Sequence, residues 1–191
     1  NLKDKSKDPN AEKPLTHKEN FLAERNKLRA ENKVEEVEKT IEKMRGRQED
    51  VANEMEDINK DLEDVANTLG QPIAIENINK EHIKQAIEKV NESVSEAEAR
   101  IISLSNILAQ NPGSQVAQRE LAEANKAKRD GEAKIKNISS VLDRKNKNKE
   151  KETTILTNIE KQESIIAKQK EIIEKEQETI DKYEKQQQSS S

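Results

Sequence analysis

Apolar residues recur in alternating steps of three and four along most of this chain, the spacing of one face of an α-helix that packs against another helix. The clearest run lies between residues 34 and 69 and has one polar member, Gln48. Its positions are Val34, Val37, Ile41, Met44, Gln48, Val51, Met55, Ile58, Leu62, Val65 and Leu69. Because the heptad holds over this length without a slip, the run predicts one long helix at about residues 18–69.

Short local signals mark both ends of this predicted helix. Thr16 is suited to cap its amino end, with Glu19 three residues later as the second half of a capping box. Gly70 and Pro72 end it, because glycine accepts the left-handed conformation of a C-cap and proline cannot continue a helix. Three isoleucines follow in a short segment, and we expect them to fill one end of the helical bundle: Ile73, Ile75 and Ile78.

A second apolar run predicts a helix at about residues 80–110. Its positions are Ile83, Ile87, Val90, Val94, Ala97, Ile101, Leu104 and Leu108. Ile102 and Ile107 widen the apolar stripe at the far end, which indicates more than one neighbour there. Residues 111–114, Asn-Pro-Gly-Ser, form a turn signal with Ser114 as the next N-cap. A connection this short makes the two flanking helices antiparallel.

The last apolar run begins at residue 115 and is interrupted. Its first part faces the second helix through Leu121, Ala124, Ile135, Ile138 and Leu142. Gly131 and Lys128 weaken this stretch, and residues 143–152 contain no apolar side chain before the rhythm returns at Ile155. Two interpretations are open: an unbroken helix over 115–187 that is unpaired at its middle, or a hinge at 143–152 followed by a fourth helix. We favour the unbroken helix, because Lys, Glu and Arg are good helix formers.

Together these runs predict an all-α fold, an elongated antiparallel coiled-coil-like bundle of three or four long helices over residues 18–187. Residues 1–17 are polar and contain two prolines, so we expect a flexible or extended N-terminal arm there. Residues 188–191 end in serines and are typical of a linker or a cut edge. The chain begins with Asn rather than Met, as expected of a processed product or an excised fragment.

The composition favours thin helices over a thick globular core. Of the 191 residues, 39% are charged, and Phe21 and Tyr183 are the only aromatic residues.

The net charge is −4 and the two signs are interleaved, as on solvated helix faces. A nucleic-acid surface needs a stripe of one sign. Even the most basic segment, residues 144–151, alternates with Asn and Glu, which favours a solvated helix or hinge over an anion-binding patch. We therefore expect no nucleic-acid partner.

The sequence predicts no enzyme, metal or cofactor site. It has no cysteine, and its only histidines are His17 and His82, whereas a zinc site needs three or four convergent ligands. It also lacks a glycine-rich phosphate loop, and a narrow helical seam offers no desolvated pocket for acid–base chemistry. No apolar run approaches the roughly 20 residues of a membrane span. A small-molecule ligand is likewise not expected.

The candidate interaction site is an apolar ridge near the C-terminus, where paired isoleucines make the helical stripe two residues wide. Its members are Ile165, Ile166, Ile172, Ile173 and Ile180. If the last helix extends past its neighbours, this ridge would bind a protein partner or a second copy through helix–helix contacts. Alternatively, the first helix or a folded-back fourth helix covers it. The polar seam residues Gln48, Gln162 and Gln169 either specify register or partner or simply face water.

In layout, residues 18–187 resemble the long helical stalk domains of colicins and of type III secretion translocators, a likeness of pattern. The resemblance implies a secreted, periplasmic or cell-surface setting. We therefore expect a non-enzymatic structural or interaction protein, a helical stalk or docking module of a bacterial surface or secreted system. The alternatives are the soluble coiled-coil part of a pore-forming toxin or secretion translocator, and an intracellular scaffold or phage assembly factor.

Overall fold

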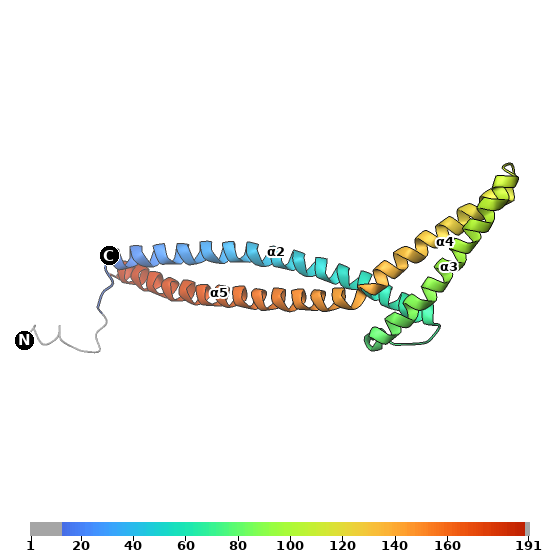
Figure 1. Cartoon of the computed structure of the whole chain (residues 1–191). Helices are drawn as coiled ribbons and strands as arrows, with labels where there is room; N and C mark the ends of the chain where they lie inside the picture. Colours follow the sequence, from blue (N-terminus) through green and yellow to red (C-terminus); the bar gives the residue numbers. More distant parts are fainter. Residues whose placement is uncertain (1–12, 190–191) are drawn as a thin grey trace, which may run out of the picture. The chain divides into compact units, whose positions relative to one another are not determined.

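A computed structural model describes residues 13–189 and shows an all-α protein, with no β-strand in that range (Figure 1). Its elements are α2 (His17–Leu69), the 3-10 helix η1 (Ile75–Asn77), α3 (Lys80–Gln110), α4 (Gln115–Ser139) and α5 (Val141–Ser189). The predicted all-helical bundle is therefore confirmed. The predicted N-terminal arm lies mostly outside the described residues, and residues 188 and 189 of the predicted linker belong to α5.

The signals at the helix ends act as the sequence predicts. The hydroxyl of Thr16 accepts a hydrogen bond from the backbone N–H of Glu19 at 3.1 Å. Gly70 has a φ of 65° directly after α2, a conformation that glycine adopts without strain. The hydroxyl of Ser114 accepts from the backbone N–H of Ala117 at 3.3 Å at the start of α4. These local signals therefore set the two chain reversals.

The predicted course of the last helix is wrong. α4 ends at Ser139 and α5 begins at Val141, so the chain is neither one helix over 115–187 nor hinged at 143–152. The hydroxyls of Ser139 and Ser140 both donate to the backbone carbonyl of Lys136, at 2.9 and 3.4 Å. Such side-chain bonds compete with the helical backbone bonds. Two consecutive serines, rather than the charged segment, therefore mark the break.

Residues 143–152 are helical and are held by polar contacts rather than left unpaired. Asn148 is only 3% exposed, and its side-chain amide donates to the backbone carbonyl of Val51 at 3.0 Å. The guanidinium of Arg144 pairs with the Asp61 carboxylate and also donates to the carbonyl of Asn137 at 2.8 Å. A search for apolar residues alone could not predict this pairing.

The chain divides into two compact units. The central unit comprises residues 48–153, and the terminal unit comprises residues 1–47 and 154–191, of which 13–47 and 154–189 are described. Helices α2 and α5 contribute residues to both units, whereas η1, α3 and α4 lie in the central unit alone.

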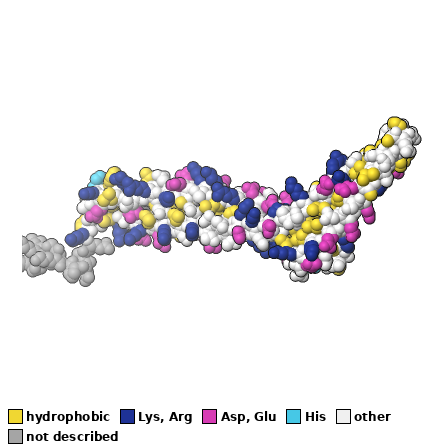
Figure 2. Space-filling model, viewed as in Figure 1, with side chains coloured by type: hydrophobic (Ala, Val, Ile, Leu, Met, Phe, Trp, Pro, Cys, Tyr) yellow, Lys and Arg dark blue, Asp and Glu magenta, His cyan; other side chains and the backbone are white. Residues whose placement is uncertain are grey.

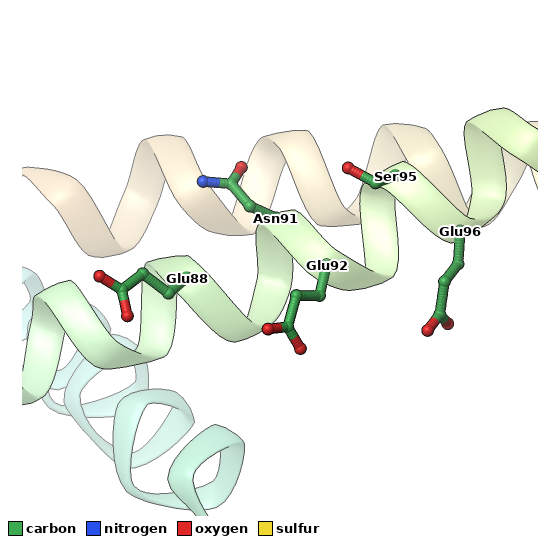
Figure 3. Close-up of a pocket in the computed structure, with 5 residues that line it drawn as sticks. All are labelled: Glu88, Asn91, Glu92, Ser95 and Glu96. Atoms are coloured by element: carbon green, nitrogen blue, oxygen red, sulfur yellow. The ribbon is translucent and has the colours of Figure 1, made fainter.

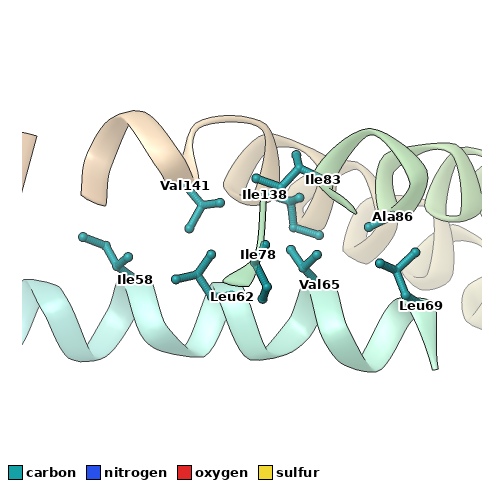
Figure 4. Packing of buried hydrophobic residues seen from close by; sticks show 9 residues of the cluster. All are labelled: Ile58, Leu62, Val65, Leu69, Ile78, Ile83, Ala86, Ile138 and Val141. Carbon is teal, nitrogen blue, oxygen red and sulfur yellow. The ribbon is translucent and has the colours of Figure 1, made fainter. Parts of the chain in front are cut away.

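The central unit has a dense apolar core (Figure 4). Its buried members come from α2, α3, α4, α5 and the segment between α2 and α3: Ile58, Leu62, Val65, Leu69, Ile78, Ile83, Ala86, Ile138 and Val141. Ile73 and Ile75 pack against this cluster, so the short isoleucine segment fills a core as expected. Leu62 and Val65 are 0% exposed, which places the most completely excluded side chains here.

Helices α3 and α4 form a hairpin whose close approach depends on a glycine. A Cβ on Gly131 would lie 2.5 Å from Cγ2 of Val94, too close for the two helices to keep this distance. The ammonium of Lys128 lies 3.8 Å from the carboxylate of Glu98 on α3. Gly131 and Lys128, which the sequence predicts to weaken this stretch, both lie at the contact with α3.

In the terminal unit, α2 and α5 lie side by side (Figure 1). Residues near the start of α2 contact residues near the end of α5, since His17 Nδ1 lies 3.3 Å from the hydroxyl of Tyr183. Further along α2, Ile41 shares a buried cluster with Ile159 of α5. The buried seam of α2 also continues towards its amino end with the same spacing, through small or polar residues that the apolar pattern does not reveal. These are Asn20, Ala23 and Ala30.

Candidate functional site

Helix α2 partly covers the predicted isoleucine ridge within the same chain. Ile165 and Ile166 pack against the buried cluster of Val37, Ile41 and Ile159. Ile180 is only 8% exposed and Ile173 is half-buried. This corresponds to the interpretation in which the first helix covers the ridge. Whether the remaining part binds a partner stays a prediction.

Ile172 is the member of the ridge that remains open, at 40% exposed. It lines a shallow hollow between α2 and α5 of the terminal unit, together with Asn26, Arg29, Ala30, Gln169 and Glu176. The lining mixes one isoleucine with both charge signs and two amides. Such a surface suits a polar helix–helix contact better than an apolar ligand.

Polar groups gather where α2 begins. Asn20 is 8% exposed, and its side-chain oxygen, buried from solvent, has no hydrogen-bond partner. Its amide donates to the Glu24 carboxylate at 3.4 Å, and the backbone N–H of Leu15 donates to the side-chain oxygen of Gln186 at 2.9 Å. An unpaired buried oxygen costs free energy, so Asn20 lowers the stability of this end of the helix pair.

Both histidines lie in the first turn of a helix and contact a neighbouring side chain. His82 and Asn79 form a reciprocal capping box at the start of α3: the N–H of His82 donates to the Asn79 side chain at 3.0 Å, and the N–H of Asn79 donates to His82 Nδ1 at 3.2 Å. His17 contacts Tyr183. No group of three or more His, Asp or Glu side chains within residues 13–189 is placed to hold a metal ion.

A surface hollow on the central unit is lined entirely by α3, by Glu88, Asn91, Glu92, Ser95 and Glu96 (Figure 3). The three carboxylates project along one helix face and do not converge on a common point. No basic residue is part of this lining. The arrangement is that of a solvated helix face, with no pair of groups set for acid–base or nucleophilic chemistry.

The half-buried Gln48, Gln162 and Gln169 leave both sequence interpretations open. Their intermediate burial fits neither a fully enclosed polar contact nor a fully solvated position.

Among the described helices, none has both the length and the apolar character needed to cross a bilayer.

Sequence reasoning missed a further surface at the end of the α3–α4 hairpin. Residues 101–118 contain no Asp, Glu, Lys or Arg, although 39% of the chain is charged. Three of the large apolar side chains that remain exposed lie in this run: Ile102, Ile107 and Val116. The signal was available in the sequence as a charge-free run, which a search for heptads does not detect.

Comparisons with known proteins add no functional assignment. No protein-family model matches this chain, and neither the curated proteins nor the solved structures contain a significant match.

Proposed function

We propose that this protein is a non-enzymatic helical spacer and docking module that acts through helix–helix contacts. The observation that carries the proposal is the continuous three-and-four spacing of the buried and half-buried residues of α2, from Asn20 to Leu69. A seam of this kind holds helices together along their length and leaves long solvated faces.

Other features of the described residues support the same function. The hollows are open and lie on helix faces, with mixed or acidic linings. The ion pairs join exposed or half-buried side chains within or between helices, for example Arg45 with Glu163 at 3.5 Å. These are the properties of a scaffold whose surface meets water or another helix.

The proposal includes an antiparallel coiled coil formed by α2 and α5 in the terminal unit. Ala30 and Gln169 both line the hollow beside Ile172, so the two positions are neighbours across the helix pair. Arg45 on α2 meets Glu163 on α5, while His17 meets Tyr183. A parallel pairing of two copies would instead bring Ala30 against Ala30 of the second copy.

The absence of cysteine makes this arrangement testable with engineered disulfides. In the variant Ala30→Cys/Gln169→Cys, we expect a disulfide within one chain, formed at low protein concentration and leaving the protein monomeric on sizing. The matched control Ala30→Cys/Lys182→Cys moves the second cysteine roughly 20 Å along α5, so it should not close. Disulfide-linked dimers as the main product, or equal closure of both pairs, would contradict the proposal.

The isoleucine ridge has its own test. Ile166→Lys should destabilise the terminal unit, because Ile166 packs against the buried cluster. Ile172→Lys should leave the helix content and the unfolding midpoint nearly unchanged, because Ile172 is 40% exposed. If Ile172→Lys unfolds the protein as strongly as Ile166→Lys, the ridge has no open part to offer to a partner. Circular dichroism during urea unfolding distinguishes these outcomes.

A spacer also requires length. Helix α2 has 53 residues, which corresponds to about 80 Å at 1.5 Å per residue. We therefore expect small-angle scattering to give a maximum dimension of at least about 80 Å. A smaller maximum dimension would show that α2 does not persist as one helix in solution.

A further inference from the structure

The end of the α3–α4 hairpin differs in chemistry from the rest of the chain. Residues 101–118, which we call the hairpin tip, form the longest run without a charged residue and are flanked by Arg100 and Arg119. In the space-filling view this end is mainly yellow and white, whereas the helices elsewhere carry blue and magenta side chains (Figure 2). A protein that keeps its other helix faces charged therefore has one neutral end.

The exposed apolar side chains of the hairpin tip lie outside its buried cluster. Leu104 and Ala117 are 6% and 5% exposed and form the packed interior of the hairpin at this end. Ile102, Ile107 and Val116 are instead 64%, 50% and 62% exposed. The wide apolar stripe predicted from the sequence thus has an inner part that packs within the hairpin and an outer part that faces outward.

Backbone and side-chain hydrogen bonds fix the turn at the end of the hairpin tip. The side-chain amide of Gln118 donates to the carbonyl of Pro112 at 3.0 Å. The N–H of Asn111 donates to the carbonyl of Ile107 at 2.8 Å, and the N–H of Ser114 donates to the carbonyl of Asn111 at 3.2 Å. A surface held in this way loses little conformational freedom on binding.

We propose that the hairpin tip docks into a concave, uncharged, largely apolar pocket on a different protein. This inference deepens the docking function proposed above and rests on it. The core of a protein interface is depleted of charged residues and enriched in apolar contacts, which matches residues 101–118. A charged pocket would lose the hydration of its charges and gain no opposite charge from the tip, so the pocket is expected to be neutral.

The small area at the end of the hairpin tip favours a different protein over a second copy of this chain as the partner. Two helices, each about 10 Å across, present an end of roughly 200 Å². A specific interface buries about 800 Å² per partner, so two convex tips meeting end to end would bury too little. A concave pocket can also cover the sides of the tip, where Ile107 and Val116 are exposed.

Hydrogen-bonding groups favour a protein pocket over a lipid bilayer. The tip carries Gln110, Asn111 and Gln115 beside its apolar residues. In hydrocarbon each unpaired amide would cost several kcal/mol, whereas protein interfaces supply about one hydrogen bond per 100–200 Å². The tip also lacks the Trp and Tyr residues that anchor proteins at a membrane surface.

Site-specific photo-cross-linking in the cells that make this protein tests the proposal. A photoreactive amino acid at Val116 should give one discrete protein adduct, whereas the same group at Glu123, exposed on α4 outside the tip, should not. Ile107→Asp should reduce the adduct at least tenfold, and Ala99→Asp, a charge on α3 just outside the tip, should leave it unchanged. Unaltered circular dichroism of both variants shows that the fold is intact.

Five outcomes would overturn the proposal. An adduct of twice the chain mass would mean that the protein associates with itself. Flotation of the protein with phosphatidylcholine vesicles, with Val116 as the point of contact, would mean that the tip binds a bilayer. Equal labelling from Glu123 or survival of the adduct in Ile107→Asp means that the tip is not the contact. A cross-linked partner peptide in a strongly charged surface contradicts the neutral pocket. The disulfide test of the terminal unit is independent of all five outcomes, so failure of the helix-pair proposal would be recognised separately.

Discussion

The central and terminal units use the same two helices and the same heptad spacing, yet they bury different side chains. In the central unit the buried α2 positions include Leu62 and Val65, both 0% exposed, and residues from α3, α4 and α5 pack around them. In the terminal unit the first buried α2 positions are Asn20, Ala23 and Ala30. Among the described residues of this unit, a small buried apolar cluster around Val37 draws on both helices.

The difference shows that spacing and stability come from separate properties of the sequence. The buried positions of α2 keep alternating steps of three and four in both units, although the side chains at those positions differ. The stabilisation depends on the apolar area that is removed from water, about 25 cal/mol per Å². We therefore infer that the central unit carries most of the stability and that the terminal unit is held more weakly.

The largest expected effect comes from the same truncation in the two units. Ile58→Ala should lower the free energy of unfolding by about 3–5 kcal/mol, because Ile58 is fully buried and its cavity cannot collapse readily. Ile159→Ala, in the terminal cluster, should cost about 2 kcal/mol. Urea unfolding followed by circular dichroism measures both. Equal costs, or a larger cost for Ile159→Ala, would remove the contrast between the units.

Replacing one glycine in each unit with alanine gives a second comparison, in which the free energy of unfolding should change in opposite directions. Gly131→Ala should destabilise by about 1–3 kcal/mol, because its Cβ would overlap the Val94 side chain. Gly46→Ala should stabilise by about 0.5–1 kcal/mol, since Gly46 lies inside α2 and no atom would lie within 4 Å of an added Cβ. Thermal unfolding of the two variants is sufficient. A stable Gly131→Ala protein would show that α3 and α4 can separate without cost.

The buried asparagines sharpen the comparison further. Asn148→Ala should lower the free energy of unfolding by about 1–2 kcal/mol, because its amide donates to the carbonyl of Val51. Asn20→Ala should change it by less than about 0.5 kcal/mol, because the variant loses an oxygen that has no partner and gains helix propensity. If Asn20→Ala is the more damaging change, the terminal unit relies on this residue for specific packing.

The ion pairs should show the smallest effect. Asp61→Asn should cost about 1 kcal/mol, since the side chains of Arg144 and Asp61 are only 30% and 20% exposed. Glu163→Gln should cost less than about 0.3 kcal/mol, because Arg45 and Glu163 are more than half exposed. Raising the salt concentration should erase the second effect before the first. A double-mutant cycle on each pair checks the ranking.

The sequence predicts those parts of the fold that depend on local chemistry. Gly70 and Ser114 determine helix ends through their own backbone and side-chain preferences, so the reversals are placed correctly. The break at Ser140 is not predictable in the same way, because serine occurs within helices as well as at their ends. The cap formed by His82 was missed because Asn79 and His82 lack the usual Ser/Thr and Glu/Gln pattern.

Contacts between helices were harder to predict. The three-and-four rule counts apolar residues, so it cannot recognise Asn148 as a buried seam residue or Gly131 as the point of closest approach between α3 and α4. The ridge residues were identified, but the first helix was only one of the alternatives for the element that covers them. Asn20, Ala23 and Ala30 do not stand out as the face that α2 offers to α5. The hairpin tip was indicated by the widened apolar stripe at Ile102 and Ile107, but its lack of charge was not recognised.

Native-state hydrogen exchange measures both units in the same molecule and so tests the central claim most directly. We expect the highest opening free energies for the backbone amides of residues 58–65 and 138–142. Those of residues 20–30 and 173–183 should be lower by a few kcal/mol. Equal protection in the two sets, or greater protection in residues 20–30, would contradict the conclusion that the central unit carries most of the stability.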